Sequence, residues 1–234
     1  MYKRVLIKLS GEALGKAGRL FDHAKIAEVA NVIKDVRALG VQVGIVTGGG
    51  NIWRGRKDAP AGMDAVTADQ IGMTATLLNC LCLKDALQQK AEKAVVLSAV
   101  FMDRLCEPFR ADKAEAYLEE GAVTLFAFGS GHPFFSTDTA VALRAVEMKA
   151  DAILMAKSID GVYTADPHLD ANARLIKDIT YDECIARNLK VMDQAAFALC
   201  RDNNVPMIRV FALSDPENIH KVVRGDTMGS FIHP

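Results

Sequence analysis

A short apolar run that ends in three consecutive glycines constrains the fold of this chain more than any other feature. Residues 41–46 are predicted to form a buried strand of a parallel sheet, and Thr47-Gly48-Gly49-Gly50-Asn51 follows at once. Glycines at the carboxyl end of a strand let a ligand approach the backbone, and they tolerate the positive φ angles that turn successive N–H groups into one concavity. Arg54 is placed to reach a phosphate held there. The alternative is a tight strand-to-helix turn that binds nothing.

A second strand, glycine turn and helix occur later in the chain. Residues 123–128 are predicted as a buried strand, and the helix 138–148 follows the turn, with Ser136 or Thr137 as its cap. Free N–H groups and hydroxyls at a helix N-terminus form an anion site. The turn opens like a dinucleotide fingerprint, but Phe134 stands where the third glycine is required, so a Rossmann NAD site is not expected.

Strands and helices alternate along the chain, with no distinct linker and no internal repeat. Further strands are predicted at 4–9, 95–98, 152–155, 207–211 and 228–232, and helices at 22–39, from 64 or 67 to 89, 113–120, after 180, 194–201 and 215–224. In the long second helix, Ile71, Ala75, Leu78 and Leu81 are expected to face inward. The pattern predicts a single α/β domain over residues 1–234, with a mostly parallel sheet and two loosely defined lobes.

Composition narrows the range of functions. The 234 residues carry a formal net charge of −1, which argues against nucleic-acid binding by bulk electrostatics. No run approaches the roughly 18 apolar residues of a membrane span, and the first strand is too short for the core of a signal peptide. The five cysteines show no Cys-x-x-Cys spacing, as expected for buried, reduced thiols. We therefore expect a cytoplasmic protein with no nucleic-acid or membrane partner.

Cations and glycine turns at strand ends suit phosphoryl transfer, which needs positioning and charge neutralisation more than covalent chemistry. Lys8 lies near the end of the first strand, where a cation reaches either the solvent or a ligand at the sheet edge. Lys8 and Arg54 are predicted to hold the transferred group, with N–H donors from residues 48–50. Mg²⁺ would bridge the donor phosphates, through Asp193 or Asp166. The segment 11–17 lacks the spacing and the hydroxyl of a P-loop.

Five motifs, in order along the chain, resemble those of the bacterial uridylate kinases. They are Lys8-Leu9-Ser10-Gly11-Glu12-Ala13-Leu14, Gly48-Gly49-Gly50-Asn51 with Arg54-Gly55, Gly131-His132-Pro133-Phe134-Phe135-Ser136-Thr137-Asp138, Asp160-Gly161-Val162-Tyr163-Thr164-Ala165-Asp166-Pro167 and Lys190-Val191-Met192-Asp193-Gln194-Ala195-Ala196-Phe197. The resemblance spans almost the whole chain. It implies the amino acid kinase fold, a three-layer αβα sandwich with a mostly parallel central sheet. It also implies phosphorylation of UMP to UDP by Mg-ATP in pyrimidine nucleotide synthesis, with the N-terminal part mainly binding UMP and phosphate and the C-terminal part mainly binding ATP.

The same resemblance implies roles for individual residues. The catalytic residues would be Lys8, Arg54 and Asp193. ATP would be bound by Lys8, Leu9, Ser10, Gly11, Gly50, Arg54, Lys157, Tyr163 and Asp166. UMP would be bound by Gly49, Asp69, Ser130, Gly131, His132, Pro133, Phe134, Phe135, Ser136 and Thr137. Mg²⁺ would enter with ATP, with Asp193 as the candidate protein carboxylate.

Two positions and one segment depart from the pattern of these kinases. His132 stands where they often have Asn, and Lys157 stands near an ATP-contacting Thr or Asn. Residues 15–20 match poorly the segment associated with activation by GTP. A homohexamer, activation by GTP and inhibition by UTP are implied by the resemblance alone.

Two other functions stay open on sequence grounds. One is a kinase of the same fold that acts on a carboxylate, a carbamate or a small phosphate; the loop 131–138 argues against it, because it resembles that of the uridylate kinases. The other is a nucleotide- or oxyanion-binding or storage protein of the same fold without kinase activity. Retention of Lys8, Arg54 and Asp193 argues against storage. Spacing predicts a phosphoryl-transfer enzyme, and only the resemblance names uridine.

Overall fold

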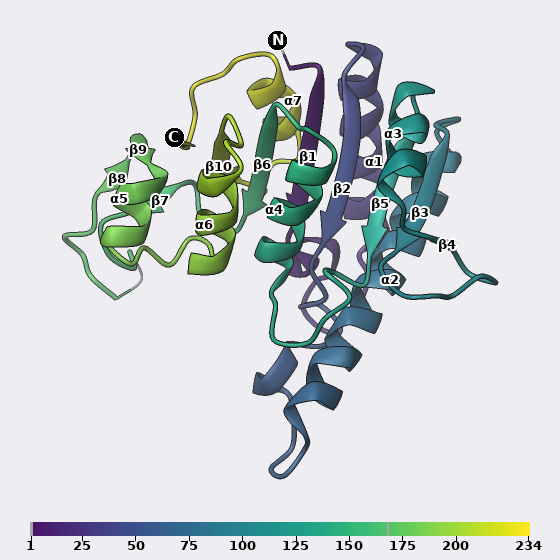
Figure 1. Cartoon of the computed structure of the whole chain (residues 1–234), viewed down its shortest axis with the longest axis horizontal. Coiled ribbons are helices and arrows are strands. Elements are labelled where there is room, and N and C mark those ends of the chain that lie inside the picture. The colour runs from purple at the N-terminus through teal and green to yellow at the C-terminus, as the bar shows by residue number, and fades with distance from the viewer. Residues whose placement is uncertain (1, 168) are drawn as a thin grey trace.

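Among the residues that the computed structural model describes, 2–167 and 169–234, nine strands form one central sheet (Figure 1). Their order is β4-β3-β5-β2-β1-β6-β10-β11-β9, and all neighbours are parallel except the antiparallel pair β10 and β11. The strands are β1 Arg4–Leu9, β2 Gln42–Thr47, β3 Ala94–Ser98, β4 Glu107–Pro108, β5 Val123–Ala127, β6 Ala152–Lys157, β9 Asp178–Thr180, β10 Ile208–Ala212 and β11 Ser230–His233. A separate antiparallel pair consists of β7 Val162–Tyr163 and β8 Leu175–Ile176.

Helices cover both faces of this sheet. They are α1 His23–Ala38, α2 Ala65–Gln88, α3 Ala111–Glu119, α4 Thr137–Glu147, α5 Tyr181–Ala186, α6 Gln194–Asp202 and α7 Glu217–Val223, with short 3-10 turns η1 Gly11–Leu14 and η2 Gly55–Lys57. Side chains of α1, α2 and α7 pack with one set of strand residues, and those of α3, α4, α5 and α6 pack with the other. The predicted three-layer αβα fold with a mostly parallel sheet is therefore confirmed.

Alternation along the central strand β1 explains how one strand serves two cores. Val5, Ile7 and Leu9 join the core under α1 and α2, whereas Leu6 joins the core under α4. Successive side chains of a strand point to opposite faces, so Lys8 shares the α4 face with Leu6. Strand β1 thus places the ammonium group of Lys8 near the N-terminal end of α4.

Most predicted boundaries agree with the structure to within a few residues, because local capping sets them. Asp22, Asp64 and Thr180 each accept a hydrogen bond from a backbone N–H in the first turn of α1, α2 and α5. The inward stripe predicted for α2 was wrong at Leu78, which is 42% exposed. The buried stripe of α2 runs instead through Leu77, Cys80, Leu83 and Leu87.

The carboxyl ends of the parallel strands meet at one edge of the sheet. In Figure 1 the arrows of β2, β5 and β6 point to this lower edge, and the first turns of α2 project beyond it. Loops that follow β1, β2, β5 and β6 therefore gather in one region. No helix in the described part of the chain is long and apolar enough to cross a membrane.

Candidate active site

Two lysines on adjacent strands converge on one partly buried carboxylate at the carboxyl edge of the sheet. The ammonium nitrogen of Lys8 lies 3.3 Å from Oδ1 of Asp138, and that of Lys157 lies 3.2 Å from Oδ2. Lys157 also donates to the backbone carbonyl of Val191. Because β1 and β6 are paired in parallel, the two lysines extend from the same face of the sheet toward α4. We refer to Lys8, Asp138 and Lys157 as the lysine cluster.

Burial and charge shift the pKa values inside the lysine cluster. Burial alone would raise the pKa of Asp138, but the charges of Lys8 and Lys157 and their hydrogen bonds hold it below its ordinary value. Burial lowers the pKa of Lys157, with a further lowering from Lys8, and the nearby Asp138 opposes this change. Two lysines thus face one carboxylate inside the cluster, and Asp193 is a further acid whose charge acts on Lys157. The two ammonium groups at the edge of the sheet suit a ligand with negative charge.

The N-terminus of α4 is tied to the N-terminus of α6 beside the lysine cluster. Ser136 caps α4 by accepting from the backbone N–H groups of Asp138 and Thr139. The hydroxyls of Ser136 and Thr139 both donate to the carboxylate of Asp193, at 2.9 Å for Thr139. Asp193 in turn caps α6 through the N–H of Ala196 at 2.8 Å. Asp193 thus has both oxygens engaged and anchors the end of the loop after β5.

The two glycine turns after β1 and β2 fit together because they lack side chains. A Cβ on Gly11 would lie 2.5 Å from the carbonyl oxygen of Gly48, and one on Gly49 would lie 2.8 Å from that of Gly72 in α2. The expected positive φ angles are absent at residues 48–50, so that part of the prediction was wrong. Close approach of backbones requires these glycines. Leu9 is buried at the end of β1, and Ser10 is the residue directly before η1.

The side chain of Arg54 lies across the glycine turn that follows β2, and it is 59% exposed. Its Nε donates to the carbonyl of Gly50 at 3.3 Å, and its Nη2 lies 3.2 Å from Glu12. It also lines a polar cavity of about 410 Å³ with Gly50 and the turn 15–19. The structure therefore brings Arg54 to the predicted glycine turn, in an ion pair with Glu12 rather than with the lysine cluster.

The loop between β5 and α4, residues 129–136, is held by two contacts near its C-terminal end. Ser136 donates to Asp193, and Oδ2 of Asp69 in α2 accepts from the N–H of Phe134 at 2.8 Å. Phe134 has a positive φ of 70°. The predicted acceptor residues Gly49, Asp69 and 130–137 thus lie on connected segments, and His132 is an exposed loop residue whose N–H donates to Ser130.

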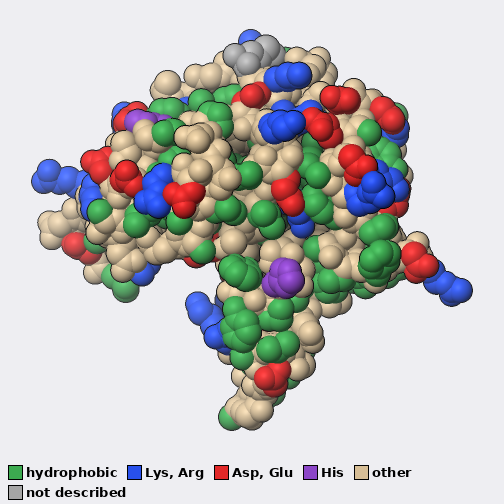
Figure 2. Space-filling model, viewed as in Figure 1, with side chains coloured by type: hydrophobic (Ala, Val, Ile, Leu, Met, Phe, Trp, Pro, Cys, Tyr) green, Lys and Arg blue, Asp and Glu red, His purple; other side chains and the backbone are tan. Residues whose placement is uncertain are grey.

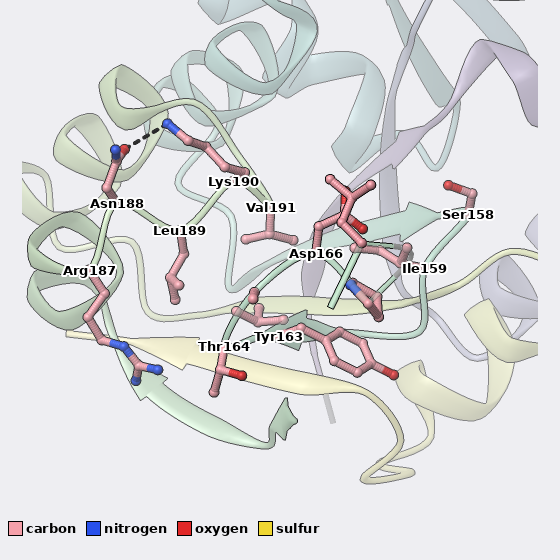
Figure 3. A pocket seen from close by; sticks show the side chains of 14 residues that line it. Ser158, Ile159, Tyr163, Thr164, Asp166, Arg187, Asn188, Leu189, Lys190 and Val191 are labelled. Atoms are coloured by element: carbon pink, nitrogen blue, oxygen red, sulfur yellow. Dashed lines mark hydrogen bonds between the residues drawn. The ribbon is translucent and has the colours of Figure 1, made fainter. Parts of the chain in front are cut away.

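A cavity of about 500 Å³ lies beyond the end of β6 (Figure 3). One wall comes from Ser158, Ile159 and the strand and loop around Tyr163 and Asp166, and the other comes from residues 187–191 between α5 and α6. In Figure 3 the side chains of the two walls are seen around the cavity, and Lys190 donates to Asn188 at 2.9 Å. Its volume falls within the range of small-molecule sites, roughly 300–1,000 Å³.

Comparison with known proteins decides the family. The model of the amino acid kinase family matches residues 3–210. The chain belongs to the amino acid kinase family. Among solved structures, the UMP kinase from Bacillus anthracis is 38% identical with a TM-score of 0.94, over 99% of this chain and 96% of that one. The UMP kinase from Ureaplasma parvum is 36% identical with a TM-score of 0.93, over 100% of both chains.

A more distant relative shows the same fold. The uridylate kinase from Archaeoglobus fulgidus is 28% identical with a TM-score of 0.75, over 97% of this chain and 99% of that one. The resemblance to uridylate kinases inferred from the five motifs is therefore confirmed within the amino acid kinase family.

The sequence analysis missed several residues that the structure of this chain places at the candidate site. Asp138, the centre of the lysine cluster, and Thr139, a partner of Asp193, were not among the predicted site residues. The available signal for Asp138 was its place in the first turn of a helix, two residues after the cap Ser136. In that place its carboxylate meets Lys8 at the end of β1. Arg187 and Asn188, which line the 500 Å³ cavity, carried no motif of their own.

Proposed function

We propose that this chain transfers the γ-phosphoryl group of ATP to UMP, giving ADP and UDP. The single observation that carries the proposal is the lysine cluster, in which a buried lysine and a partly buried one meet on one carboxylate at the carboxyl edge of the sheet. The cluster has the charge that a transferred phosphoryl group requires. The solved UMP kinases that match the whole chain support uridylate as the acceptor.

Donor and acceptor would approach this cluster from opposite sides. The adenine nucleotide would occupy the 500 Å³ cavity beside Tyr163 and Asp166, with its phosphates directed toward Lys157 at the end of β6. The acceptor would lie under the loop 129–136, against Asp69 and Gly49. The N–H groups of the glycine turns and the guanidinium of Arg54 would neutralise phosphate charge between them.

The reaction needs no protein nucleophile. A phosphate oxygen of UMP, already ionised at neutral pH, attacks the γ-phosphorus of ATP and forms a new P–O bond. The bond from that phosphorus to the bridging oxygen breaks, and ADP leaves with the electron pair. Lys8 and Lys157 stabilise the charge that spreads over the transferred oxygens, while Asp138 keeps both ammonium groups in position. His132 has no proton to remove.

We expect magnesium to enter this site together with the phosphates of ATP. No group of three or more His, Cys, Asp or Glu side chains in the described residues is arranged to hold a metal ion. Both oxygens of Asp193 already accept hydrogen bonds, so we propose that this carboxylate contributes neighbouring charge while ATP supplies most of the ligands. When bound, Mg²⁺ neutralises the donor phosphates.

The test is product analysis by anion-exchange chromatography after incubation with Mg-ATP and a panel of acceptors: UMP, CMP, AMP and glutamate. We expect UDP and ADP in equal amounts with UMP and little product with the others. Product with glutamate would favour a carboxylate kinase. Nucleotide binding without any product would favour the binding or storage function.

The resemblance also leads us to propose a homohexamer in the cytoplasm that GTP activates and UTP inhibits. Sedimentation velocity measures the assembly, and initial rates with added GTP or UTP measure the effectors. A monomer, or rates unchanged by both nucleotides, would contradict this part of the proposal and leave the transfer reaction standing.

A further inference from the structure

Three segments meet at one carboxylate oxygen in front of the loop 129–136. Nη2 of Arg56, from η2, lies 3.4 Å from Oδ2 of Asp69 in α2. The backbone N–H of Phe134 donates to the same oxygen at 2.8 Å. The guanidinium carbon of Arg56 lies 5.0 Å from the centroid of the Phe134 ring. Arg56 therefore contacts both the acid and the ring that the acid holds.

The conformation of Phe134 requires such support. Its φ of 70° is in the left-handed region, which is costly for a residue with a bulky side chain and persists only where surrounding contacts hold it. Burial of the ring does not hold it, because Phe134 is 65% exposed. The hydrogen bond to Asp69 and the planar guanidinium over the ring are two contacts in the described structure that can support this conformation.

The surface around these contacts is mixed. Figure 2 shows hydrophobic side chains gathered on the projecting lower part of the molecule, with lysine or arginine side chains beside them. Phe134 and Phe135 are among the exposed large hydrophobic residues of the described chain. Lys57, the next residue after Arg56, has no side-chain partner among the described residues, so the cationic contact belongs to one position rather than to general surface charge.

We propose that Arg56 is a positioning residue for the acceptor: it holds Asp69 and Phe134 so that the loop 129–136 stays in the conformation that binds the acceptor nucleotide. This inference rests on the proposed function, since it concerns the acceptor side of the same reaction. These contacts engage only Oδ2 of Asp69. Its Oδ1 can therefore accept a hydrogen bond from a hydroxyl group of the acceptor nucleotide. A planar guanidinium supplies both the charge and the stacking face, whereas a lysine supplies the charge alone.

Hydrogen exchange tests the contact without any substrate. In the free protein, we expect the hydrogen bond to Asp69 to protect the Phe134 amide from exchange. Exposed ion pairs and cation–π contacts are each worth a fraction of a kcal/mol to about 1 kcal/mol, so we expect Arg56→Ala to speed exchange of this amide about threefold to tenfold. Lys57→Ala is the matched control and should leave the rate unchanged. An unchanged rate in Arg56→Ala would overturn the proposal.

Steady-state kinetics test the consequence for the acceptor. Arg56→Ala should raise KM for UMP about threefold to tenfold, by the same contacts, with kcat within about twofold of the parent. Arg56→Lys should recover part of the loss. Phe134→Ala should raise KM as well, and the double variant should add little to either single change, because both act through one contact.

Each kinetic result has a separate meaning. A lower KM in Arg56→Ala would mean that Arg56 competes with the acceptor for Asp69, which contradicts a positioning role. A fall in kcat at unchanged KM would also overturn it. If the parent protein failed to phosphorylate UMP, the proposed function would be wrong, and the exchange rate of the Phe134 amide would still decide whether Arg56 holds the loop.

Discussion

Replacing Lys157 by methionine separates a catalytic role of the lysine cluster from a structural one. Methionine keeps most of the volume of the side chain and removes its charge. The Lys157 ammonium lies 3.2 Å from Asp138, an attraction of about 5 kcal/mol at an effective dielectric constant of about 20. Desolvation of a buried ion costs several kcal/mol, so the two contributions nearly cancel.

Asp138 keeps a partner in this variant, because Lys8 lies 3.3 Å from its other oxygen. We therefore expect Lys157→Met to change the free energy of unfolding by no more than about 1 kcal/mol, which is about 2–4 °C in Tm for a chain of this size. Removing one donor to the charge of a transition state costs about 10²–10³ in kcat. Activity should thus fall by that factor while the fold is retained.

The assay is kcat at saturating UMP and Mg-ATP, with Tm from calorimetry on the same samples. Lys34→Met is the matched control, because Lys34 is an exposed lysine of α1 with no side-chain partner among the described residues. A kcat within about threefold of the parent would refute the placement of Lys157 at the transferred group. A large fall in Tm would show that its role is structural.

Four further outcomes are expected. Lys8→Ala should collapse turnover and leave UMP binding by calorimetry nearly intact; turnover within a few-fold of the parent would contradict this. Asp69→Asn should weaken the apparent affinity for UMP more than it slows turnover at saturation, and the reverse pattern would remove Asp69 from the acceptor site. Asp138→Asn removes the carboxylate nearest to Lys8 and Lys157, so urea unfolding at pH 7 should show a loss of about 3–5 kcal/mol; because the pKa of Asp138 is lowered in the folded state, that loss should shrink as pH falls through it. Burial lowers the pKa of Lys157, so the folded state binds this proton more weakly than the unfolded state. The parent protein should therefore gain stability as pH rises from the lowered pKa toward the ordinary lysine value. Lys157→Met should lack this gain.

Local signals explain which parts of the fold were predictable. The strand 4–9 was predicted with the bounds that the structure shows, because a short, mostly apolar run is typical of a strand that is buried on both faces. The start of the first helix followed from Asp22, a cap residue that acts within three positions. The start of α2, which the sequence left at 64 or 67, is set by the cap at Asp64. Leu78 was placed inward wrongly, since it lies one residue off the buried stripe of α2.

The candidate site was predictable only where it is written in local motifs. The glycine turns and the loop 129–136 are continuous in sequence, and they were found. The lysine cluster depends on the pairing of β1 with β6, strands about 150 residues apart, so their order in the chain did not indicate it. The contact of Arg56 with Asp69 and Phe134 joins three segments in the same way. Tertiary neighbours of this kind follow from topology and not from spacing.

A single-turnover experiment tests direct transfer at the lysine cluster. The protein is mixed with UMP and ATP labelled in the γ-phosphoryl group, quenched at successive times, and separated into protein, UDP, ATP and inorganic phosphate. We expect the label to pass from ATP to UDP at one rate, with none on the protein. Label on the protein, or release as inorganic phosphate without UDP, would contradict direct transfer between two bound nucleotides.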